Sequence, residues 1–382
     1  MASAQTTLTE QQAIDLALKS HPAMAITSHQ IRQQEVLKNA GPMWEPSQLF
    51  HNVTADPDLG ILGTSTFGVA QSFPSGKMTR ANRDLHASRQ AQAAARQGMT
   101  RQEIVRQVRE IYHHLSYLDG KAALNNRLDS VWQRVARAAD VRYRAGEVSL
   151  SEKLAAQDKA SQVRLEARTV QHEIEFDRIV LGQILGLGEP VLPVVEPLHE
   201  GGFSIADTSL LRSSAMAKYG QAAIQVARSE QEATKAKSSP TYSAGVYGQI
   251  LGNGDVYPGW QVGLNLPLFR KSLLAQSEAA EVGIAAAGAE FRSALLAQQN
   301  ELGHLLHQQE KYQIMLEYYA AEGKQLAAEL LRSGSLNYAQ GEMSFADFVQ
   351  MMEQAAGIEA QHLEHLLGLN QAIIELEALT GQ

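Results

Sequence analysis

A short sequence pattern occurs twice in this chain at a fixed spacing. Gly146-Glu147-Val148-Ser149 is matched 195 residues later by Gly341-Glu342-Met343-Ser344. Gly186 is matched by Gly381 at the same offset. Repetition at a fixed period is the signature of a duplicated architecture. The chain is therefore expected to fold as two copies of one structural unit.

Each expected repeat has the same order of elements: two helices, a β-hairpin, a very long helix, a tight turn and a helix with a heptad seam. The repeats span 8–188 and 208–382, and a Pro- and Gly-rich linker at 189–207 joins them. The first repeat is expected to contain a hairpin at 48–73, a long helix at 75–143, a turn at 144–149 and a helix at 149–186. The second is expected to contain a hairpin at 241–268, a long helix at 271–333, a turn at 340–344 and a helix at 344–380.

The long helices are unusual for a globular protein. No proline occurs from Ser75 to Tyr143, and a helix of that length would reach roughly 100 Å. The helix after the first turn carries apolar residues at alternating spacings of three and four, with Asp177 as the polar exception. This heptad seam predicts helices that pack side by side along their length. Its residues are Ala160, Val163, Ala167, Val170, Ile174, Asp177, Leu181 and Ile184.

One stretch predicts a β-strand more clearly than any other. From residue 260 onward, apolar and polar residues alternate, which is the period of a strand with one apolar face. Pro267 is expected to end the strand because it has no N–H to donate. Such a face suits either a half-buried soluble sheet or contact with lipid. The apolar positions are Trp260, Val262, Leu264, Leu266 and Leu268, and the others are Gln261, Gly263 and Asn265.

The number of strands limits how the β part can be arranged. Two hairpins give four strands, whereas a closed barrel needs about eight. The strands therefore form a small soluble sheet or combine between chains, and three chains would supply about twelve. Aromatic residues lie in or near the second hairpin, as in the aromatic girdle of a membrane barrel. They are Tyr242, Tyr247, Tyr257 and Trp260.

Composition excludes several classes of function. The 382 residues carry a net charge of −8, which argues against a nucleic-acid partner. The absence of cysteine excludes disulfides, thiolate metal sites, Cys nucleophiles and a lipidated N-terminal Cys on this chain. No apolar run is long enough for a transmembrane helix. No signal peptide is visible, and Met1–Ser3 is interpreted as an added start on a mature chain.

No catalytic motif is present, so neither enzyme activity nor a cofactor is expected. The H-E-x-x-H, P-loop, G-x-S-x-G and G-x-G-x-x-G patterns are all missing. Soft sulfur and imidazole groups could still hold a metal, but Met352 and His362 fall on a heptad seam, where they are ordinary filling. We therefore predict no metal site. The residues considered were Met343, Met351, Met352, His362, His365 and the adjacent His113 and His114.

The chain resembles the outer-membrane factors of the TolC-like efflux class, from Leu8 to Gly381. The resemblance rests on the duplicated layout, on Leu266-Pro267-Leu268-Phe269 before a long helix, and on the paired turns. Residues 143–149 match the R-x-G-x-x-S/T turn of that family, whereas Ala339 replaces the arginine in the second copy. Residues 71–77 are similar to the Q-x-x-x-P-G-K stretch of the heavy-metal (CzcC/CusC-like) group, with Ser75 inserted.

The resemblance implies a mostly α fold with a small β part. Three chains would form a 12-stranded transmembrane β-barrel continuous with a coiled-coil α-helical tunnel. This trimer would lie in the outer membrane of a Gram-negative bacterium and extend into the periplasm. It would act as a passive efflux conduit with a periplasmic adaptor (membrane fusion protein) and an inner-membrane pump of the RND type, with heavy-metal cations as one possible cargo. The alternatives are a type I protein-secretion duct and a periplasmic coiled-coil adaptor or scaffold.

The resemblance also implies three sets of functional residues. The turns would dock onto the adaptor through Arg144, Gly146, Val148, Ser149, Gly341, Met343 and Ser344, unless they only join helices. The tunnel constriction would carry Asp347, Gln350 and Glu353, although a carboxylate there also suits the start of a helix. The lipid face of the barrel would carry Trp260, Val262, Leu264 and Leu266. Glu152, which corresponds to Asp347 in the first repeat, is expected to complete a capping box with Ser149.

Overall fold

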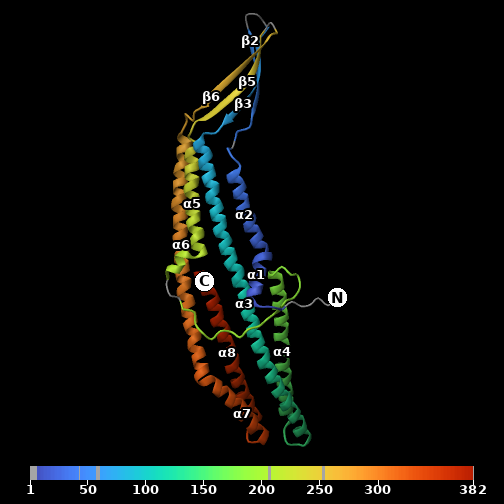
Figure 1. Cartoon of the computed structure of the whole chain (residues 1–382). Coiled ribbons are helices and arrows are strands. Elements are labelled where there is room, and N and C mark those ends of the chain that lie inside the picture. Colours follow the sequence, from blue (N-terminus) through green and yellow to red (C-terminus); the bar gives the residue numbers. More distant parts are fainter. Residues whose placement is uncertain (1–6, 43, 57–60, 205–207, 252–253, 382) are drawn as a thin grey trace. The chain divides into compact units, whose positions relative to one another are not determined.

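The computed structural model describes residues 7–42, 44–56, 61–204, 208–251 and 254–381 (Figure 1). The loops of both expected hairpins, the end of the expected linker and the last residue of the expected second repeat fall partly or wholly outside this part. The described chain is mostly helical with a small β part, which confirms that much of the expected fold class. The chain divides into two compact units: Met1–Ala25, Thr100–Ser214 and Leu296–Gln382 form the first, and Ile26–Met99 and Ala215–Leu295 the second.

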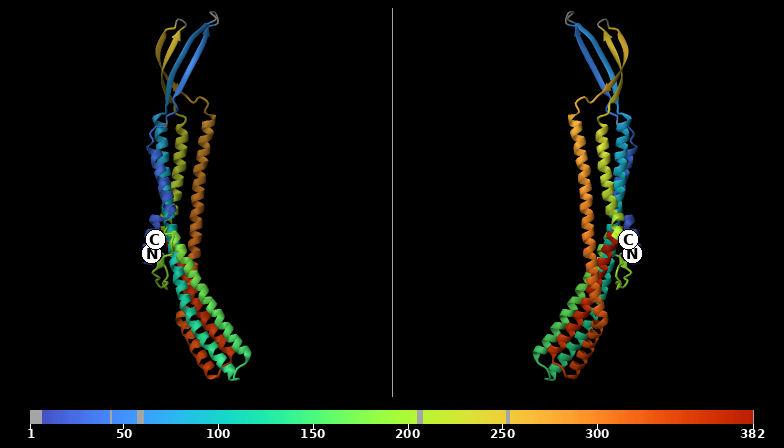
Figure 2. Two further views of the ribbon diagram at one scale, coloured as in Figure 1. Left: turned by 90° about the vertical axis from the view of Figure 1, so that its right-hand side faces the viewer. Right: turned by 90° about the vertical axis from the view of Figure 1, so that its left-hand side faces the viewer.

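The second unit contains an antiparallel sheet with strand order β2-β3-β5-β6. Figure 2 shows a twisted sheet with helix ends gathered at one end of it. Helix α2 (Pro22–Asn39) precedes the first hairpin and α3 (Gly76–Arg144) follows it, while α5 (Ala215–Ala236) and α6 (Lys271–Tyr318) flank the second. The strands are β2 (Gln48–Asp56), β3 (Ile61–Phe73), β5 (Thr241–Leu251) and β6 (Val256–Asn265).

The first unit packs helices around parts of α3 and α6. Thr9 begins α1 (Glu10–Ser20) with a reciprocal capping box to Gln12. The other helices are α4 (Leu150–Ile184), α7 (Lys324–Gln340), α8 (Phe345–Thr380) and the short 3₁₀ turn η1 (Thr208–Ser213). Strand β1 (Thr7–Leu8) pairs in parallel with β4 (Leu192–Pro193). Within the described residues, no helix is both long enough and apolar enough to cross a membrane.

Most of the heptad seam of α4 is buried, including Val163 and Leu181, while Ala167, Asp177 and Ile184 are partly buried. Its polar exception has a partner, because Asp177 Oδ2 lies 2.6 Å from Nδ1 of His114 on α3. Near the turns, the rings of Trp132 and Phe348 meet edge to face at 5.5 Å. The helices of this unit therefore pack lengthwise through a continuous series of apolar contacts.

The segment between α4 and η1 is held to the helices by side-chain amides that bond to its backbone N–H and C=O groups, as a neighbouring β-strand would. The amide of Asn370 on α8 accepts from the backbone N–H of His199 and donates to its carbonyl, at 3.0 and 2.8 Å. Gln309 on α6 makes the same pair of bonds to Phe203, at 3.1 and 3.0 Å. Asn370 is almost fully buried. These bonds satisfy backbone groups that have no regular secondary structure of their own.

The structure corrects the predicted boundaries in three places. The helix expected at 271–333 is interrupted by the π-helical turn η2 (Tyr319–Gly323), where the Tyr319 ring stacks on His362 at 3.7 Å. A wider turn of this kind inserts a residue without ending the helix, and α7 then continues to Gln340. The hairpin expected to reach 268 ends at Asn265, before Pro267. The two helices expected before the second hairpin are the short turn η1 and the single helix α5, which runs through Gly220, where the Phe291 ring packs against it.

Candidate functional site

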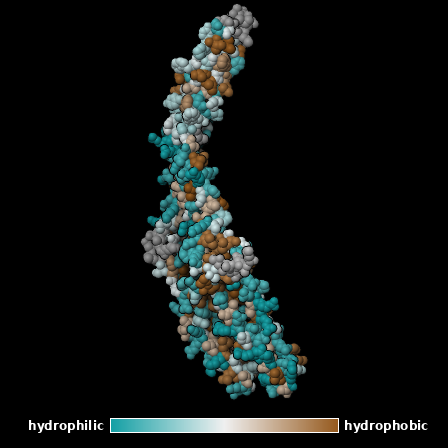
Figure 3. Space-filling model, turned by 45° about the vertical axis from the view of Figure 1, so that its right-hand side comes forward, coloured by the Kyte–Doolittle hydropathy of each residue, from teal (hydrophilic) through white to brown (hydrophobic). Residues whose placement is uncertain are grey.

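The sheet has one apolar face that is exposed to solvent. Residues directly opposite each other in an antiparallel ladder share a face, so Leu49, Val69, Val246 and Trp260 form one apolar row across all four strands. Leu49 is 84% exposed and Trp260 is 75% exposed. Figure 3 shows brown, apolar side chains over this part of the molecule. An exposed apolar surface of this kind marks an interaction site.

The other face of the sheet carries mainly small and polar side chains, together with the aromatic rings of Phe50, Tyr247 and Tyr257. The row next to the apolar one consists of Gln48, Ala70, Gly245 and Gln261. Along β5 the residues of this face are less exposed than their apolar neighbours. Glycines on this face lie under neighbouring side chains; a Cβ at Gly259 would lie 2.4 Å from the Tyr247 ring. The sheet is thus polar on its more enclosed side and apolar on its open side.

Both edges of the sheet are open within the described residues. Strand β2 pairs only with β3, and β6 pairs only with β5. Each edge strand therefore presents a row of unpaired backbone N–H and C=O groups. Either edge can accept a further strand.

Three of the four residues predicted for a lipid face lie on the apolar face. Trp260, Val262 and Leu264 are 75%, 73% and 54% exposed. Leu266 is exposed too, but it follows the end of β6 and is not part of the ladder. The sequence pattern extended past the strand because Leu266 and Leu268 keep its parity in the loop that leads to α6.

The two helical turns have the same backbone conformation. Gly146 and Gly341 both have a φ of 78°, in the left-handed region that favours glycine. The following residue closes the same bond in each turn: Glu147 N–H donates to Arg142 C=O, and Glu342 N–H donates to Asn337 C=O, both at 2.9 Å. This is the hydrogen-bond pattern of a Schellman motif.

Serine begins the next helix after each turn. Ser149 Oγ accepts from the N–H of Glu152 at 3.1 Å, and Ser344 Oγ accepts from the N–H of Asp347 at 3.2 Å. Arg144 is exposed and pairs with Asp140 at 2.6 Å. Val148 is partly buried, and Met343 packs on the apolar core beneath the turns. The residues predicted for docking thus include exposed groups and groups that hold the turn.

The residues predicted for a constriction occupy the first turns of α8. Asp347 and Gln350 are exposed, and the Asp347 carboxylate accepts from the Ser344 hydroxyl at 2.6 Å. Glu353 forms an ion pair with Lys159 of α4 at 2.5 Å. Within a single chain, Asp347 therefore acts at a helix start, and the charge of Glu353 is compensated.

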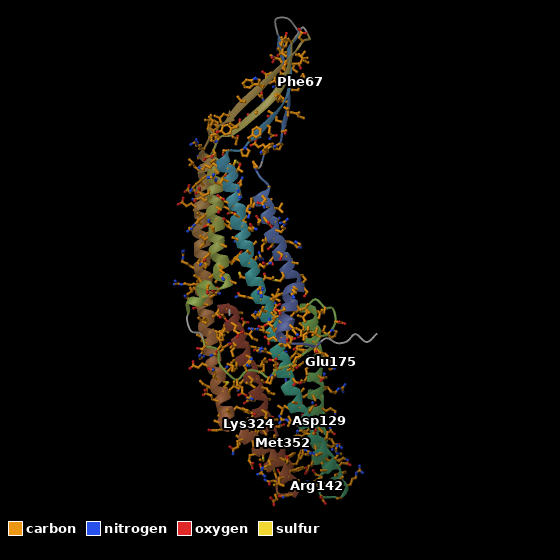
Figure 4. The ribbon with its side chains drawn as sticks, viewed as in Figure 1. Phe67, Asp129, Arg142, Glu175, Lys324 and Met352 are labelled. Carbon is orange, nitrogen blue, oxygen red and sulfur yellow. The ribbon has the colours of Figure 1, made fainter. Side chains whose placement is uncertain are left out.

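Glu152 bonds to a residue that the sequence did not single out. Its side chain accepts from the Tyr338 hydroxyl at 2.9 Å rather than closing a capping box. The Tyr338 ring stacks on Phe348 at 4.6 Å, and the Arg142 guanidinium lies 5.7 Å from its centre; Figure 4 labels Arg142 near the turns. Burial and the bond to Glu152 raise the pKa of Tyr338 to about 12. A tyrosine inside a long helix gave no sequence signal for this link.

The histidines and methionines considered as metal ligands have other contacts. Met352 is buried in the core near the turns, and the ring of His362 stacks on Tyr319. Burial and nearby positive charge lower the pKa of His365. Nε2 of His113 lies 3.5 Å from the Glu10 carboxylate. Within the described residues, no group of three or more His, Cys, Asp or Glu side chains is arranged to hold a metal ion.

Comparison with known proteins agrees with this geometry. Residues 61–187 match a family model described as "Outer membrane efflux protein". No curated protein matches the chain in sequence. A membrane protein from Pseudomonas aeruginosa has a similar structure, with a TM-score of 0.82 and 15% identity over 97% of this chain and 90% of that one.

Two named proteins have the same fold. The outer membrane protein VceC of Vibrio cholerae aligns with a TM-score of 0.78 and 15% identity, over 97% of this chain and 96% of that one. CusC aligns with a TM-score of 0.79 and 13% identity, over 97% and 91%. The sequence match and the shared fold together confirm that this chain resembles the outer membrane efflux proteins.

Proposed function

We propose that three copies of this chain form a passive export conduit in the outer membrane of a Gram-negative bacterium. In this assembly β6 of each copy pairs with β2 of the next, and four strands from each of three chains give a closed barrel of about twelve strands. The helices of the three copies form a tunnel wall. The similarity to outer membrane efflux proteins supports the class of function.

The sheet is the observation that carries the proposal. A bilayer requires every backbone polar group to be paired, so a spanning sheet must have no free edge. In the part of the chain that the structure describes, this sheet has two free edges, an apolar face and a polar face. Joining the edges between copies turns the apolar faces toward lipid and the polar faces toward a lumen. Pairing the edge strands between copies thus gives the backbone N–H and C=O groups their hydrogen-bond partners and places the apolar surface against lipid.

The turns support a narrower proposal about partners. We propose that the surfaces around Gly146 and Gly341 dock onto a periplasmic adaptor, which connects the conduit to an inner-membrane pump of the RND type. Because the two turns share one backbone conformation, each chain has two turns of the same shape. Gly and Ser at these positions allow the close backbone approach that helix contacts need.

Heavy-metal cations are the cargo class that residues 71–77 favour. In this chain Gln71 binds the backbone carbonyl of Glu45 at 2.6 Å and the Ser47 hydroxyl at 2.6 Å, so it also has a structural role. Deleting the gene should then raise metal sensitivity. If deletion instead blocks release of a secreted polypeptide, the alternative of a type I secretion duct is correct.

Assembly is tested first by mass and conductance. Protein purified in detergent is expected to have three times the chain mass of 41.7 kDa and to produce channel steps in planar bilayers. A monomer that remains dispersed without detergent, and shows no conductance, contradicts the proposal.

Cysteine cross-linking tests the joined edges directly, because the chain has no native cysteine. Gln48→Cys on β2 and Gln261→Cys on β6 lie on the polar face at opposite edges. A bismaleimide should join the double variant into dimers and trimers. The control pair Val69→Cys and Val246→Cys lies in register on neighbouring strands and should cross-link only within one chain. If only the control pair gave cross-linked dimers and trimers, the proposed pairing of β6 with β2 of the next copy would be wrong.

A further inference from the structure

Lysine and arginine are absent from both hairpins and occur immediately beside them. No Lys or Arg occurs from residue 39 to 76 or from 238 to 269. The first gap lies between Lys38 and Lys77, and the second between Lys237 and Arg270. This placement differs from a general surface distribution, because each cation-free segment corresponds to strands and their loops.

These cations gather where helices meet the sheet. Helices α2, α3, α5 and α6 all have one end next to the sheet, as Figures 1 and 2 show. We define the basic collar as six exposed side chains on these ends and the adjoining loops. None of them forms an ion pair within the described part of the chain. The collar consists of Lys77, Arg80, Arg83, Lys237, Arg270 and Lys271.

Helix electrostatics alone does not account for the collar. Cations are unfavourable near helix N-termini, where the backbone dipole favours acidic groups. Helices α1, α4 and α8 follow this rule with Glu10, Glu152 and Asp347 in their first turns. Helices α3 and α6 have no acidic residue there and carry Lys77 and Lys271 in their first turns. Lys77 and Lys271 therefore occupy positions that cost local helix stability, whereas Lys237 follows the C-terminal end of α5, where the dipole favours a cation.

Apolar and aromatic side chains lie directly beside the collar. Phe269 and Leu268 are 95% and 77% exposed and immediately precede Arg270. Trp44 is also largely exposed, and its ring meets Phe73 edge to face at 5.3 Å. Passing from the sheet to the helices, an apolar face is followed by aromatic rings and then by cations. This is the order of groups at a lipid–water boundary.

An open groove adjoins the collar and includes two of its cations. An open groove of about 570 Å³ lies between α3 and α5 and is lined by Lys77, Arg80 and Arg228, with Asp84 and Glu232 on its walls. Glu232 pairs with Lys235 at 3.0 Å. The groove is lined by three cations and two carboxylates, although the whole chain carries a charge of −8.

We propose that the basic collar binds the headgroups of anionic phospholipids in the membrane leaflet next to these helix ends. The inference rests on the proposed function, because it requires the apolar face of the sheet to lie in a bilayer. The cations lie at the depth where headgroup phosphates would be, and each cation near an anionic surface strengthens attachment. The collar thereby fixes how deeply the sheet sits in the membrane.

Vesicle flotation tests the lipid preference. Wild-type protein is expected to partition more strongly into vesicles of phosphatidylcholine with phosphatidylglycerol than into phosphatidylcholine alone, and salt should reduce the difference. The variant K77Q/R80Q/R83Q/K237Q/R270Q/K271Q should lose this preference, by up to about fivefold per cation removed. Inorganic phosphate at matched ionic strength should not compete better than chloride, because the binding surface is a bilayer.

Two control variants keep the result decisive. One replaces six exposed cations away from the sheet, Lys19, Arg101, Arg134, Arg137, Arg168 and Arg212, with Gln and should retain the wild-type preference. The other exchanges Lys for Arg and Arg for Lys within the collar and should retain it as well, even if the neutral variant folds poorly. Unchanged preference in the neutral collar variant, or equal loss in the distant control, overturns the inference.

Conductance separates this inference from the proposed function. Wild type and both distant and collar variants should form channels in neutral vesicles, since the apolar face remains intact. Channels without any preference for anionic lipid would overturn only the collar. Absence of channels from the wild type in every lipid would overturn the proposed function itself.

Discussion

Gly146 and Gly341 adopt the same left-handed conformation at equivalent positions of two helical turns. Both have a φ of 78°, and the next residue in each turn donates a 2.9 Å bond to the carbonyl five positions earlier. A serine then caps the following helix in both turns. The sequence offset of 195 residues thus corresponds to one backbone geometry used twice.

Replacing either glycine with alanine should destabilise the first unit by about 1 kcal/mol, because a side chain is strained at positive φ. A Cβ at either position would meet nothing within 4 Å, so the cost is conformational and should be similar for Gly146→Ala and Gly341→Ala. Denaturant unfolding of each variant measures it.

Gly357→Ala is a matched control that should change the free energy of unfolding in the opposite direction. It lies inside α8, and a Cβ there would also meet nothing within 4 Å. Gly357→Ala should therefore stabilise the chain by up to about 1 kcal/mol. If all three substitutions had the same sign, backbone conformation would not be the cause.

The Tyr338–Glu152 bond predicts a stability difference that depends on pH. Tyr338→Phe should lower the free energy of unfolding by about 1–2 kcal/mol near neutral pH, because Glu152 loses a donor. Burial and this bond raise the pKa of Tyr338 from 10.0 to about 12. The native state thus retains the phenol proton in a range where the unfolded chain releases it.

The sign follows from that difference in proton binding. The contribution of Tyr338 is fully present below the unfolded pKa and is lost as pH rises from about 10 to about 12. Wild type should therefore lose its advantage over Tyr338→Phe in this window. Chemical unfolding of both proteins at pH about 8 and about 11 measures the change. A constant difference would show that the hydroxyl does not titrate as described.

Introducing a lysine at two adjacent residues of β6 should have different effects on the yield of trimer. Val262 lies on the apolar face and Gln261 on the polar face. In the proposed barrel, Val262→Lys places a cation against lipid at a cost of about 2–4 kcal/mol, whereas Gln261→Lys places it in the lumen. The trimer recovered from membranes should fall for Val262→Lys and remain near wild type for Gln261→Lys. Equal yields would indicate that this face does not meet lipid.

Asn370 should be more important for stability than its position in a helix suggests. Asn370→Leu leaves the N–H and C=O of His199 without their partner, which should cost about 2 kcal/mol or more. Asn126→Leu, at an exposed position of α3, should change stability by less than about 0.5 kcal/mol. Urea unfolding compares the two, and similar small effects would show that the segment at His199 is held by other contacts.

Local periodicity was sufficient to predict the main elements of this fold. The absence of proline predicted a helix at 75–143, and the structure has α3 at Gly76–Arg144. Ser149 was recognised as a helix cap because capping depends on residues only three positions apart. The apolar alternation from Trp260 predicted which residues share one face of β6.

Contacts between distant segments could not be predicted from such patterns. The π turn at Tyr319 accompanies stacking on His362, which lies on another helix. Glu152 satisfied the spacing of a capping box, but Tyr338 offered its carboxylate a better donor. Asn370 was unremarkable beside the heptad seam until the backbone of His199 was placed against it. The lipid-facing, docking and constriction roles of the predicted residues stay predictions.

The two open edges of the sheet have a consequence for stoichiometry. Joining β6 of one copy to β2 of another is a head-to-tail contact, which makes a ring only when the rotation between copies divides a full circle and otherwise makes an open filament. In the proposed assembly, that rotation is set by how strongly each four-stranded sheet bends, and Gly259 and Gly263 leave the space beside them to the side chains of Tyr247 and Ser243. The number of subunits would then be encoded in the curvature of a single chain.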